Sequence, residues 1–198
     1  MSRPLHLTFD DGPDPLWTPR VLDVLAAHGA TATFFVLGRA VRRAPRMLEA
    51  ILDGGHAIGL HGEAHLDHTK ATPEDVARDT AAALDVLHGH GVAPDLWRLP
   101  WGRHGATTGA IAQRHGLRIV GWDADTHDWR GDGWDDQPED VRGVARHGGV
   151  VLLHDGFGPG ATRTSCANTL ALVDAFLEIA DAEGLTAASI EPAERCRA

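Results

Sequence analysis

The chain has few cysteines, no long hydrophobic run and fewer positive than negative charges. Each of these features excludes a class of function. Only two of its 198 residues are cysteines, Cys166 and Cys196, which lie too far apart for a CxxC metal or redox motif. They could form a disulfide or remain two free thiols. No apolar stretch approaches the length of a membrane span. With 18 Lys and Arg against 28 Asp and Glu, the net charge of −10 argues against nucleic acid or an anionic membrane as a partner.

The sequence also lacks linkers, low-complexity segments and a Gly-x-Gly-x-x-Gly dinucleotide motif. Its length suits a substantial core, so we expect a single domain over residues 1–198, acting as a monomer. The first four residues lead directly into a predicted strand without a signal peptide. We therefore expect either a cytoplasmic protein or the mature or trimmed form of a secreted one.

Strand-like and helix-like segments alternate along the chain. Seven short runs are predicted as strands: residues 4–9, 31–37, 57–60, 96–99, 117–124, 150–154 and 186–190. Helices are predicted over residues 18–28, 41–52 (interrupted at Pro45), 72–88, 107–115, 138–146 and 168–183. This alternation indicates an α/β fold with a parallel sheet and outer helices. Seven repeats favour a closed or nearly closed barrel over an open doubly wound sheet.

The most informative short motif is Thr8-Phe9-Asp10-Asp11-Gly12-Pro13. An apolar strand ends there in two adjacent carboxylates, and a Gly-Pro turn follows. Two neighbouring acids are unfavourable unless a cation lies beside them. Taken alone, however, the pair is better explained as a solvated turn, where Asp is common.

A second motif, His61-Gly62-Glu63-Ala64-His65, changes that interpretation. On a helix or helical turn, histidines at i and i+4 would share one face and could share a metal ion. Both motifs place ligand-type side chains just past a predicted strand. One carboxylate and two histidines would form a hydrolytic divalent-metal site, most simply for zinc. The plain alternative is two exposed histidines in a chain that has 13.

Further polar residues follow other predicted strands. Arg98 follows the fourth strand, Asp125 the fifth and His154 the sixth. In an α/β barrel the carboxyl ends of the strands form one face, where chemistry collects. We therefore expect these residues and the two motifs to converge on one mouth of the barrel.

Five segments together resemble the polysaccharide deacetylase family, also called carbohydrate esterase family 4 or the NodB-homology domain. They extend in the family's order over nearly the whole chain: TFDDGP at 8–13, HGEAH at 61–65, RLPWG at 98–102, DTHDW at 125–129 and LLHD at 152–155. The first motif is specific, and the other four gain weight from their order. The resemblance implies a distorted (β/α)7 barrel, in agreement with the number of predicted strands.

The resemblance also implies a role for each matching residue. Asp11, His61 and His65 correspond to a metal triad that usually binds zinc, with Co²⁺ or another divalent ion as alternatives. Asp10 corresponds to the catalytic base, and Arg98 to the arginine that orients this base.

A second group of residues matches the leaving-group side of the family's site. His154 corresponds to the general acid, with either Asp125 or Asp128 holding its ring. The backbone N–H of Trp101 corresponds to the oxyanion donor. Two residues would line the groove and the small pocket for the acetyl methyl: Trp129 and Leu152. From tryptophan chemistry we also expect exposed sugar-stacking platforms at Trp129 and Trp134.

Position 62 departs from the family pattern, which usually has Ser or Thr directly after the first metal histidine. Gly62 removes the hydrogen bond of that hydroxyl and gives the loop more conformational freedom. We expect a less precise metal site as a result, or a different branch of substrates.

The residues and the resemblance together predict a metal-dependent N-deacetylase whose partner is a carbohydrate. Expected substrates are chitooligosaccharides or peptidoglycan-type glycans of N-acetylglucosamine, with acetate released. The alternatives are an O-deacetylase of acetylated xylan, a biosynthetic deacylase of a small metabolite, or a catalytically silent sugar-binding module. The silent module is disfavoured because Asp10, Arg98 and His154 are all present, and binding alone would not need them.

Overall fold

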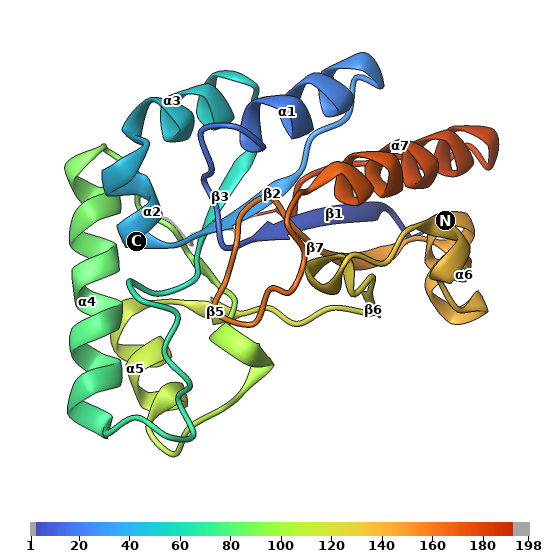
Figure 1. Cartoon of the computed structure of the whole chain (residues 1–198). Coiled ribbons are helices and arrows are strands. Elements are labelled where there is room, and N and C mark those ends of the chain that lie inside the picture. The colour runs from blue at the N-terminus through green and yellow to red at the C-terminus, as the bar shows by residue number, and fades with distance from the viewer. Residues whose placement is uncertain (1–2, 192–198) are drawn as a thin grey trace.

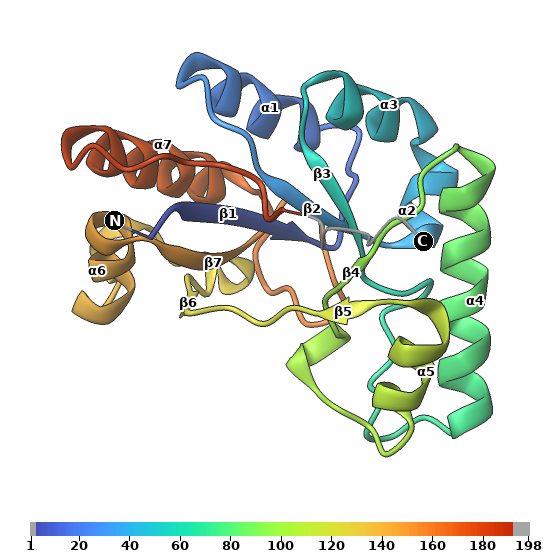
Figure 2. The same cartoon turned by 180° about the vertical axis from the view of Figure 1, so that it is seen from behind.

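Parallel strands form one curled sheet with helices on its outer side in the computed structural model, which describes residues 3–191 (Figure 1). Within those residues there are seven strands: β1 (Leu5–Asp10), β2 (Thr33–Val36), β3 (Ala57–Leu60), β4 (Leu96–Trp97), β5 (Arg118–Ile119), β6 (Ala124–Asp125) and β7 (Gly149–His154). Their spatial order is β5-β4-β3-β2-β1-β7-β6. The two edge strands, β5 and β6, are consecutive in sequence, so residues 120–123 run across the open side of the barrel (Figure 2).

Most helices connect one strand to the next, α7 follows the last strand, and together they cover the outside of the sheet (Figures 1 and 2). They are α1 (Thr18–Ala27), α2 (Gly38–Arg43), α3 (Pro45–Asp53), α4 (Pro73–Gly89), α5 (Thr108–His115), α6 (Glu139–His147) and α7 (Ala167–Ala182). Three short 3-10 turns lie over Pro100–Gly102, Asp128–Arg130 and Trp134–Asp136. None of the helices between residues 3 and 191 combines the length and the apolar character needed to span a bilayer.

Local sequence signals explain where these helices begin. The hydroxyl of Thr72 accepts a hydrogen bond from the N–H of Asp75, and Pro73 occupies the first turn of α4. Pro45 separates α2 from α3, as expected from its missing N–H. The helix predictions are therefore confirmed to within a few residues, including the break at Pro45.

The inner strand β1, paired with β2 and β7, presents one face to the helix-covered core and the other to the barrel interior. Leu5, Leu7 and Phe9 lie in the main hydrophobic cluster, where Phe9 stacks on Phe34 of β2 with ring centroids 4.9 Å apart. Alternate side chains of a strand point to opposite faces, so Asp10 points away from this cluster and into the barrel. The pairing of β1 with β7 also sets Asp10 directly beside His154.

Two of the strand predictions are wrong. Residues 117–124 do not form one strand, because the N–H of Val120 bonds to β4 whereas the N–H of Asp123 bonds to β7. The segment crosses from one edge of the sheet to the other and forms the separate strands β5 and β6. Residues 186–190 form only an isolated bridge between Ala187 and Leu5. The predicted seven-stranded barrel class is nevertheless confirmed.

The two alternatives for Cys166 and Cys196, a disulfide or two free thiols, both stay as they stood from the sequence. Cys166, just before α7, is buried and has no disulfide partner among residues 3–191. Burial raises the pKa of its thiol to about 12. Cys196 lies outside the described residues.

A candidate active site at the carboxyl ends of the strands

A cavity of about 220 Å³ opens at the carboxyl ends of the strands, where the sequence motifs were expected to converge. Nine predicted site residues line it: Asp10, Asp11, His61, His65, Trp101, Asp125, Trp129, Leu152 and His154. Arg98 and Asp128 do not line the cavity but lie directly behind it, and neither side chain is exposed to solvent.

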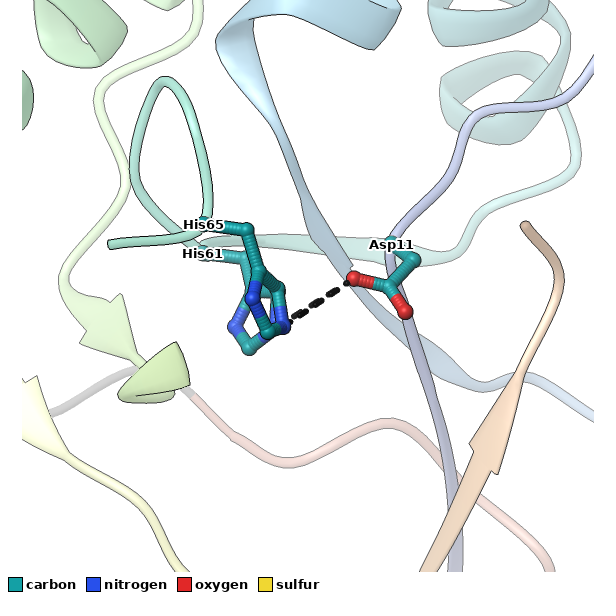
Figure 3. Close-up of side chains that lie close together, drawn as sticks. All are labelled: Asp11, His61 and His65. Carbon is teal, nitrogen blue, oxygen red and sulfur yellow. Dashed lines mark ion pairs between the residues drawn. The ribbon is translucent and has the colours of Figure 1, made fainter. Parts of the chain in front are cut away.

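Three side chains from two loops that line the cavity lie close together (Figure 3). Asp11 follows β1, while His61 and His65 follow β3. Asp11 Oδ1 lies 3.4 Å from His65 Nε2 and 3.7 Å from His61 Nε2. One potential ligand atom from each residue lies within 4.8 Å of the other two. The predicted carboxylate–imidazole cluster is therefore present in the structure.

The two histidines meet on an irregular loop, so the expected helical turn is wrong. Gly62 has φ +89° and His65 has φ +59°, both in the left-handed region. Asp11 also has a positive φ, +73°. Such a conformation costs a non-glycine residue roughly 1–2 kcal/mol, so the surrounding structure must enforce it at Asp11 and His65.

The donor atoms of this cluster fit a divalent metal ion. His61 donates its Nδ1–H to the carbonyl of Arg98 at 2.8 Å, which leaves the lone pair of Nε2 free to face Asp11. Burial, reinforced by His61, lowers the pKa of His65 to about 4 and keeps its imidazole neutral. Among the described residues, the buried Asp11 Oδ1 has no hydrogen-bond partner. One carboxylate oxygen and two neutral imidazoles form a donor set that suits zinc.

An ion pair inside the barrel fixes the second carboxylate of the first motif. Arg98 Nη1 donates to Asp10 Oδ1 at 3.2 Å and to Thr8 Oγ1 at 2.5 Å, and Nη2 donates to the carbonyl of Gly121 at 2.8 Å. The other oxygen, Asp10 Oδ2, lies 3.7 Å from His61 Nε2. One oxygen of Asp10 is thus held by Arg98, and the other faces the metal-type cluster.

The structure places Asp128, rather than Asp125, against the ring of His154. His154 Nδ1 donates to Asp128 Oδ1 at 2.7 Å, and the N–H of His154 donates to Asp128 Oδ2 at 3.0 Å. Asp125, the last residue of β6, instead accepts the N–H of His127 at 2.8 Å and lines the cavity. Burial acts to lower the pKa of His154, but the carboxylate of Asp128 outweighs it and raises the pKa to about 9.

Arg163 completes this cluster and was not identified from the sequence. Its Nη1 donates to Asp128 Oδ2 at 2.8 Å, and its Nη2 donates to the carbonyl of His154 at 2.8 Å. The hydroxyl of Thr169 donates to Asp128 Oδ2 at 2.7 Å. Burial disfavours the ionised form of Asp128, but His154, Arg163 and Thr169 together hold the pKa of Asp128 far below its ordinary value. No local motif marks Arg163, because it lies 35 residues beyond Asp128.

Tryptophans form much of the cavity wall, although not all as expected. Trp101, 45% exposed, lies with its ring centroid 5.0 Å from that of His65, and Trp129 also lines the cavity. Trp134 packs edge-on against Phe176 of α7, so the prediction of a sugar platform there is wrong. Trp122, not expected as a platform, is 37% exposed and lines the cavity.

Comparisons with known proteins point to one family. The family model described as Polysaccharide deacetylase matches residues 2–120. The chain is 36% identical over 169 residues to a protein named chitooligosaccharide deacetylase from Bradyrhizobium sp. (strain ANU 289), covering 84% of this chain and 77% of that protein.

Two solved structures superimpose closely on the chain. The crystal structure of the Bc1960 peptidoglycan N-acetylglucosamine deacetylase has a TM-score of 0.84 and 30% identity, covering 94% of this chain and 86% of that one. The family 4 carbohydrate esterase from Streptomyces lividans, in complex with acetate, has a TM-score of 0.83 and 29% identity, covering 98% and 96%.

Proposed function

The chain belongs to the polysaccharide deacetylase family, and we propose that it is a metal-dependent N-deacetylase that releases acetate from glycans of N-acetylglucosamine. The observation that carries this proposal is one cavity lined by a metal-type donor set, Asp10 and His154. Behind it, Arg98 pairs with Asp10 and Asp128 pairs with His154. The names of the relatives, which act on chitooligosaccharides and peptidoglycan, support an N-acetylated sugar as the substrate. We also propose that the chain forms a single domain and acts as a monomer.

Asp11, His61 and His65 would hold the divalent ion, zinc or, as an alternative, cobalt. When bound, such an ion polarises the acetyl carbonyl and makes water easier to deprotonate. The unpartnered Oδ1 of Asp11 and the neutral ring of His65 support this assignment.

Asp10 would act as the general base. It would accept a proton from the water whose oxygen attacks the acetyl carbonyl carbon. Arg98 holds Asp10 Oδ1, so Oδ2 remains directed toward the cluster and the attacking water. The buried guanidinium also supplies positive charge beside a carboxylate that is itself almost fully buried.

His154 would act as the general acid for the leaving amine. Its Nδ1–H is bound to Asp128, which leaves Nε2–H for the cavity. With a pKa of about 9, the ring is protonated at neutral pH and can give its proton to nitrogen as the C–N bond breaks. The products are acetate and a free amine, and the proton taken up by Asp10 replaces the one lost from His154 through solvent.

Residues of the cavity wall would bind the acetyl group. The backbone N–H of Trp101 is the proposed donor to the oxyanion, a contribution of roughly 3–4 kcal/mol for a well-placed donor. Trp101 lies in the turn Pro100–Gly102 with φ +60°, next to His65. Leu152, which is buried at the wall of the cavity, and Trp129 would together line the pocket for the acetyl methyl group and the groove for the sugar.

Acetate release from defined substrates tests the proposal. We expect zinc- or cobalt-loaded protein to release acetate from chitooligosaccharides, and the metal-stripped protein to be inactive. Acetate from acetylated xylan alone would favour the O-deacetylase instead. Turnover of small N-acylated metabolites alone would favour a biosynthetic deacylase. Glycan binding without product from any substrate would favour a silent module.

A further inference from the structure

The loop that carries both histidine ligands has no regular structure to support it. This ligand loop, residues 61–65, contains two residues with positive φ, Gly62 and His65. It also lacks the hydroxyl that the family usually has at position 62. Something else must therefore fix the position of His65 beside Asp11.

Helix α2 supports the ligand loop from one side. The N–H of Gly38 donates to the carbonyl of Gly62 at 3.0 Å, and the N–H of Arg39 donates to the carbonyl of Glu63 at 3.3 Å. These bonds satisfy carbonyl oxygens of the loop but leave its N–H groups without partners from this helix.

Asp79 of α4 supports the ligand loop from the other side. Its Oδ2 accepts the N–H of Glu63 at 2.8 Å, and its Oδ1 accepts the N–H of Ala64 at 2.9 Å. Each carboxylate oxygen thus binds one of the two peptides directly before His65. An amide of the same size would offer only one acceptor to these two donors.

The surroundings of Asp79 indicate that its carboxylate is there to accept hydrogen bonds from the ligand loop. Asp79 is 7% exposed, and within residues 3–191 it forms no salt bridge with Lys or Arg. A buried carboxylate without a cation is unfavourable unless its oxygens accept good hydrogen bonds. The two N–H groups of the ligand loop are the donors that the structure gives it.

Gly62 and Asp79 also fit one another sterically. A Cβ atom at position 62 would lie 2.6 Å from Asp79 Oδ2, closer than non-bonded atoms approach. The φ of +89° disfavours any other residue there in addition. The absence of a side chain at position 62 therefore makes room for the carboxylate.

We propose that Asp79 is a positioning residue for the metal site, replacing the hydroxyl missing at position 62 by binding the peptides that set His65 beside Asp11. The inference rests on the proposed metal site, and Asp79 itself does not line the catalytic cavity. It also means that Gly62 need not loosen the site, contrary to the expectation from sequence.

Zinc affinity, measured by competition with a chromophoric chelator, tests the role of Asp79. We expect Asp79→Asn to weaken zinc binding by about 10- to 100-fold, as typically found when a group supporting metal ligands is lost. Asp85→Asn is the matched control, because Asp85 lies on the same helix, is exposed and undergoes the same change of charge. The control should bind zinc as the wild type does. At saturating zinc, Asp79→Asn should recover most of its kcat with an unchanged KM.

A second variant, in the ligand loop, disturbs the same contact between position 62 and Asp79. Gly62→Ala should also weaken zinc binding by at least about tenfold, because its Cβ displaces the carboxylate. The double variant should lose less than the product of the two single effects, since both act on one contact. Gly62→Ala remains informative if Asp79→Asn does not fold.

The outcomes separate this inference from the proposed function. Wild-type-like zinc affinity in Asp79→Asn, or an equal loss in Asp85→Asn, would overturn the role of Asp79 while leaving the deacetylase proposal intact. Independent, multiplicative effects of Gly62→Ala and Asp79→Asn would do the same. A wild-type protein that binds no divalent ion would instead remove the metal site itself, and with it the basis of the inference.

Discussion

The two halves of the active-site cavity are built in opposite ways. The metal half consists of three residues on irregular backbone: Asp11, His61 and His65. Two of these have positive φ, and the buried Oδ1 of Asp11 has no hydrogen-bond partner within residues 3–191. The acid half consists of a hydrogen-bonded cluster: His154, Asp128, Arg163 and Thr169. There the two oxygens of Asp128 accept hydrogen bonds from all three other side chains.

Because of this difference, we expect residues of the metal half to affect mainly catalysis and residues of the acid half to affect stability as well. In the metal half, the buried Asp11 Oδ1 and His65 Nδ1 have no hydrogen-bond partner among the described residues. We therefore expect the residues of this half to serve chemistry more than folding. In the acid half both oxygens of Asp128 are satisfied by protein groups, although the buried Nε of Arg163 has no hydrogen-bond partner among residues 3–191. The side chains around His154 also join β7, α7 and the 128–130 turn. Variants in the two halves should therefore differ in what they damage.

Removal of the metal should have the largest effect on activity. Stripping the ion with a chelator is expected to lower kcat/KM on chitooligosaccharides by about 10⁴-fold, equivalent to ~5.5 kcal/mol of lost transition-state stabilisation. The far-UV circular dichroism should stay unchanged, and added zinc should restore the rate. Undiminished turnover after elemental analysis shows the metal to be gone would eliminate the metal half as the reacting centre.

Loss of the general acid should come next. His154→Ala is expected to slow hydrolysis of N-acetyl sugars by about 10³-fold, because the amine cannot leave without a proton. Hydrolysis of 4-nitrophenyl acetate, whose leaving group needs no proton, should fall by less than about tenfold. Bound zinc, measured in the same preparation, should match the wild type. Equal losses on both substrates would contradict the assigned role.

Unfolding experiments test whether the acid half contributes more to stability than the metal half. Arg163→Met leaves Asp128 without its guanidinium and should lower the free energy of unfolding by about 3–5 kcal/mol. Asp11→Asn, in the metal half, should change it by less than about 1 kcal/mol in metal-free protein. Urea denaturation provides both values.

An exposed arginine supplies the control for that experiment. Arg130 pairs with Asp132 at the surface, so Arg130→Met should change the free energy of unfolding by less than about 1 kcal/mol. A larger loss for Asp11→Asn than for Arg163→Met would reverse the comparison of the two halves.

The smallest expected effect is a change in the pKa of His154, and it tests a single contact, that with Asp128. In metal-free protein, NMR should give His154 a pKa of about 9, and Asp128→Asn should bring it toward or below 6.5, because burial then acts with less opposition. The acid must be protonated to act, so wild-type amide turnover should fall as pH rises through about 9. A pKa near 6.5 in the wild type would show that Asp128 does not set the charge of His154.

Much of this site could be predicted from the sequence, because its ligands follow strands. The apolar run before Asp10 and Asp11, and that before His61, place these side chains at the same end of a parallel sheet. The end of β7 places His154 there in the same way. For these residues, the local pattern predicts the final position, because residues at the carboxyl ends of parallel barrel strands lie on one face.

The remainder depends on contacts that no local pattern records. Asp125 ends the short strand β6 and Asp128 follows three residues later, and the left-handed turn at His127 determines which of them reaches His154. Arg163 and Asp79 act across 35 and 15–16 residues, on partners chosen by the packing of helices and loops. The segment 117–124 was apolar enough for one strand, but its two ends pair with opposite edges of the sheet.

A crystal structure of the zinc-loaded protein, with anomalous diffraction recorded on both sides of the zinc edge, tests the central claim most directly. We predict one strong peak bound by Asp11 Oδ1, His61 Nε2 and His65 Nε2 at about 2.0–2.2 Å, inside the cavity that also contains Asp10 and His154. An active crystal preparation with no peak there, or with zinc held only by other residues, would contradict the account.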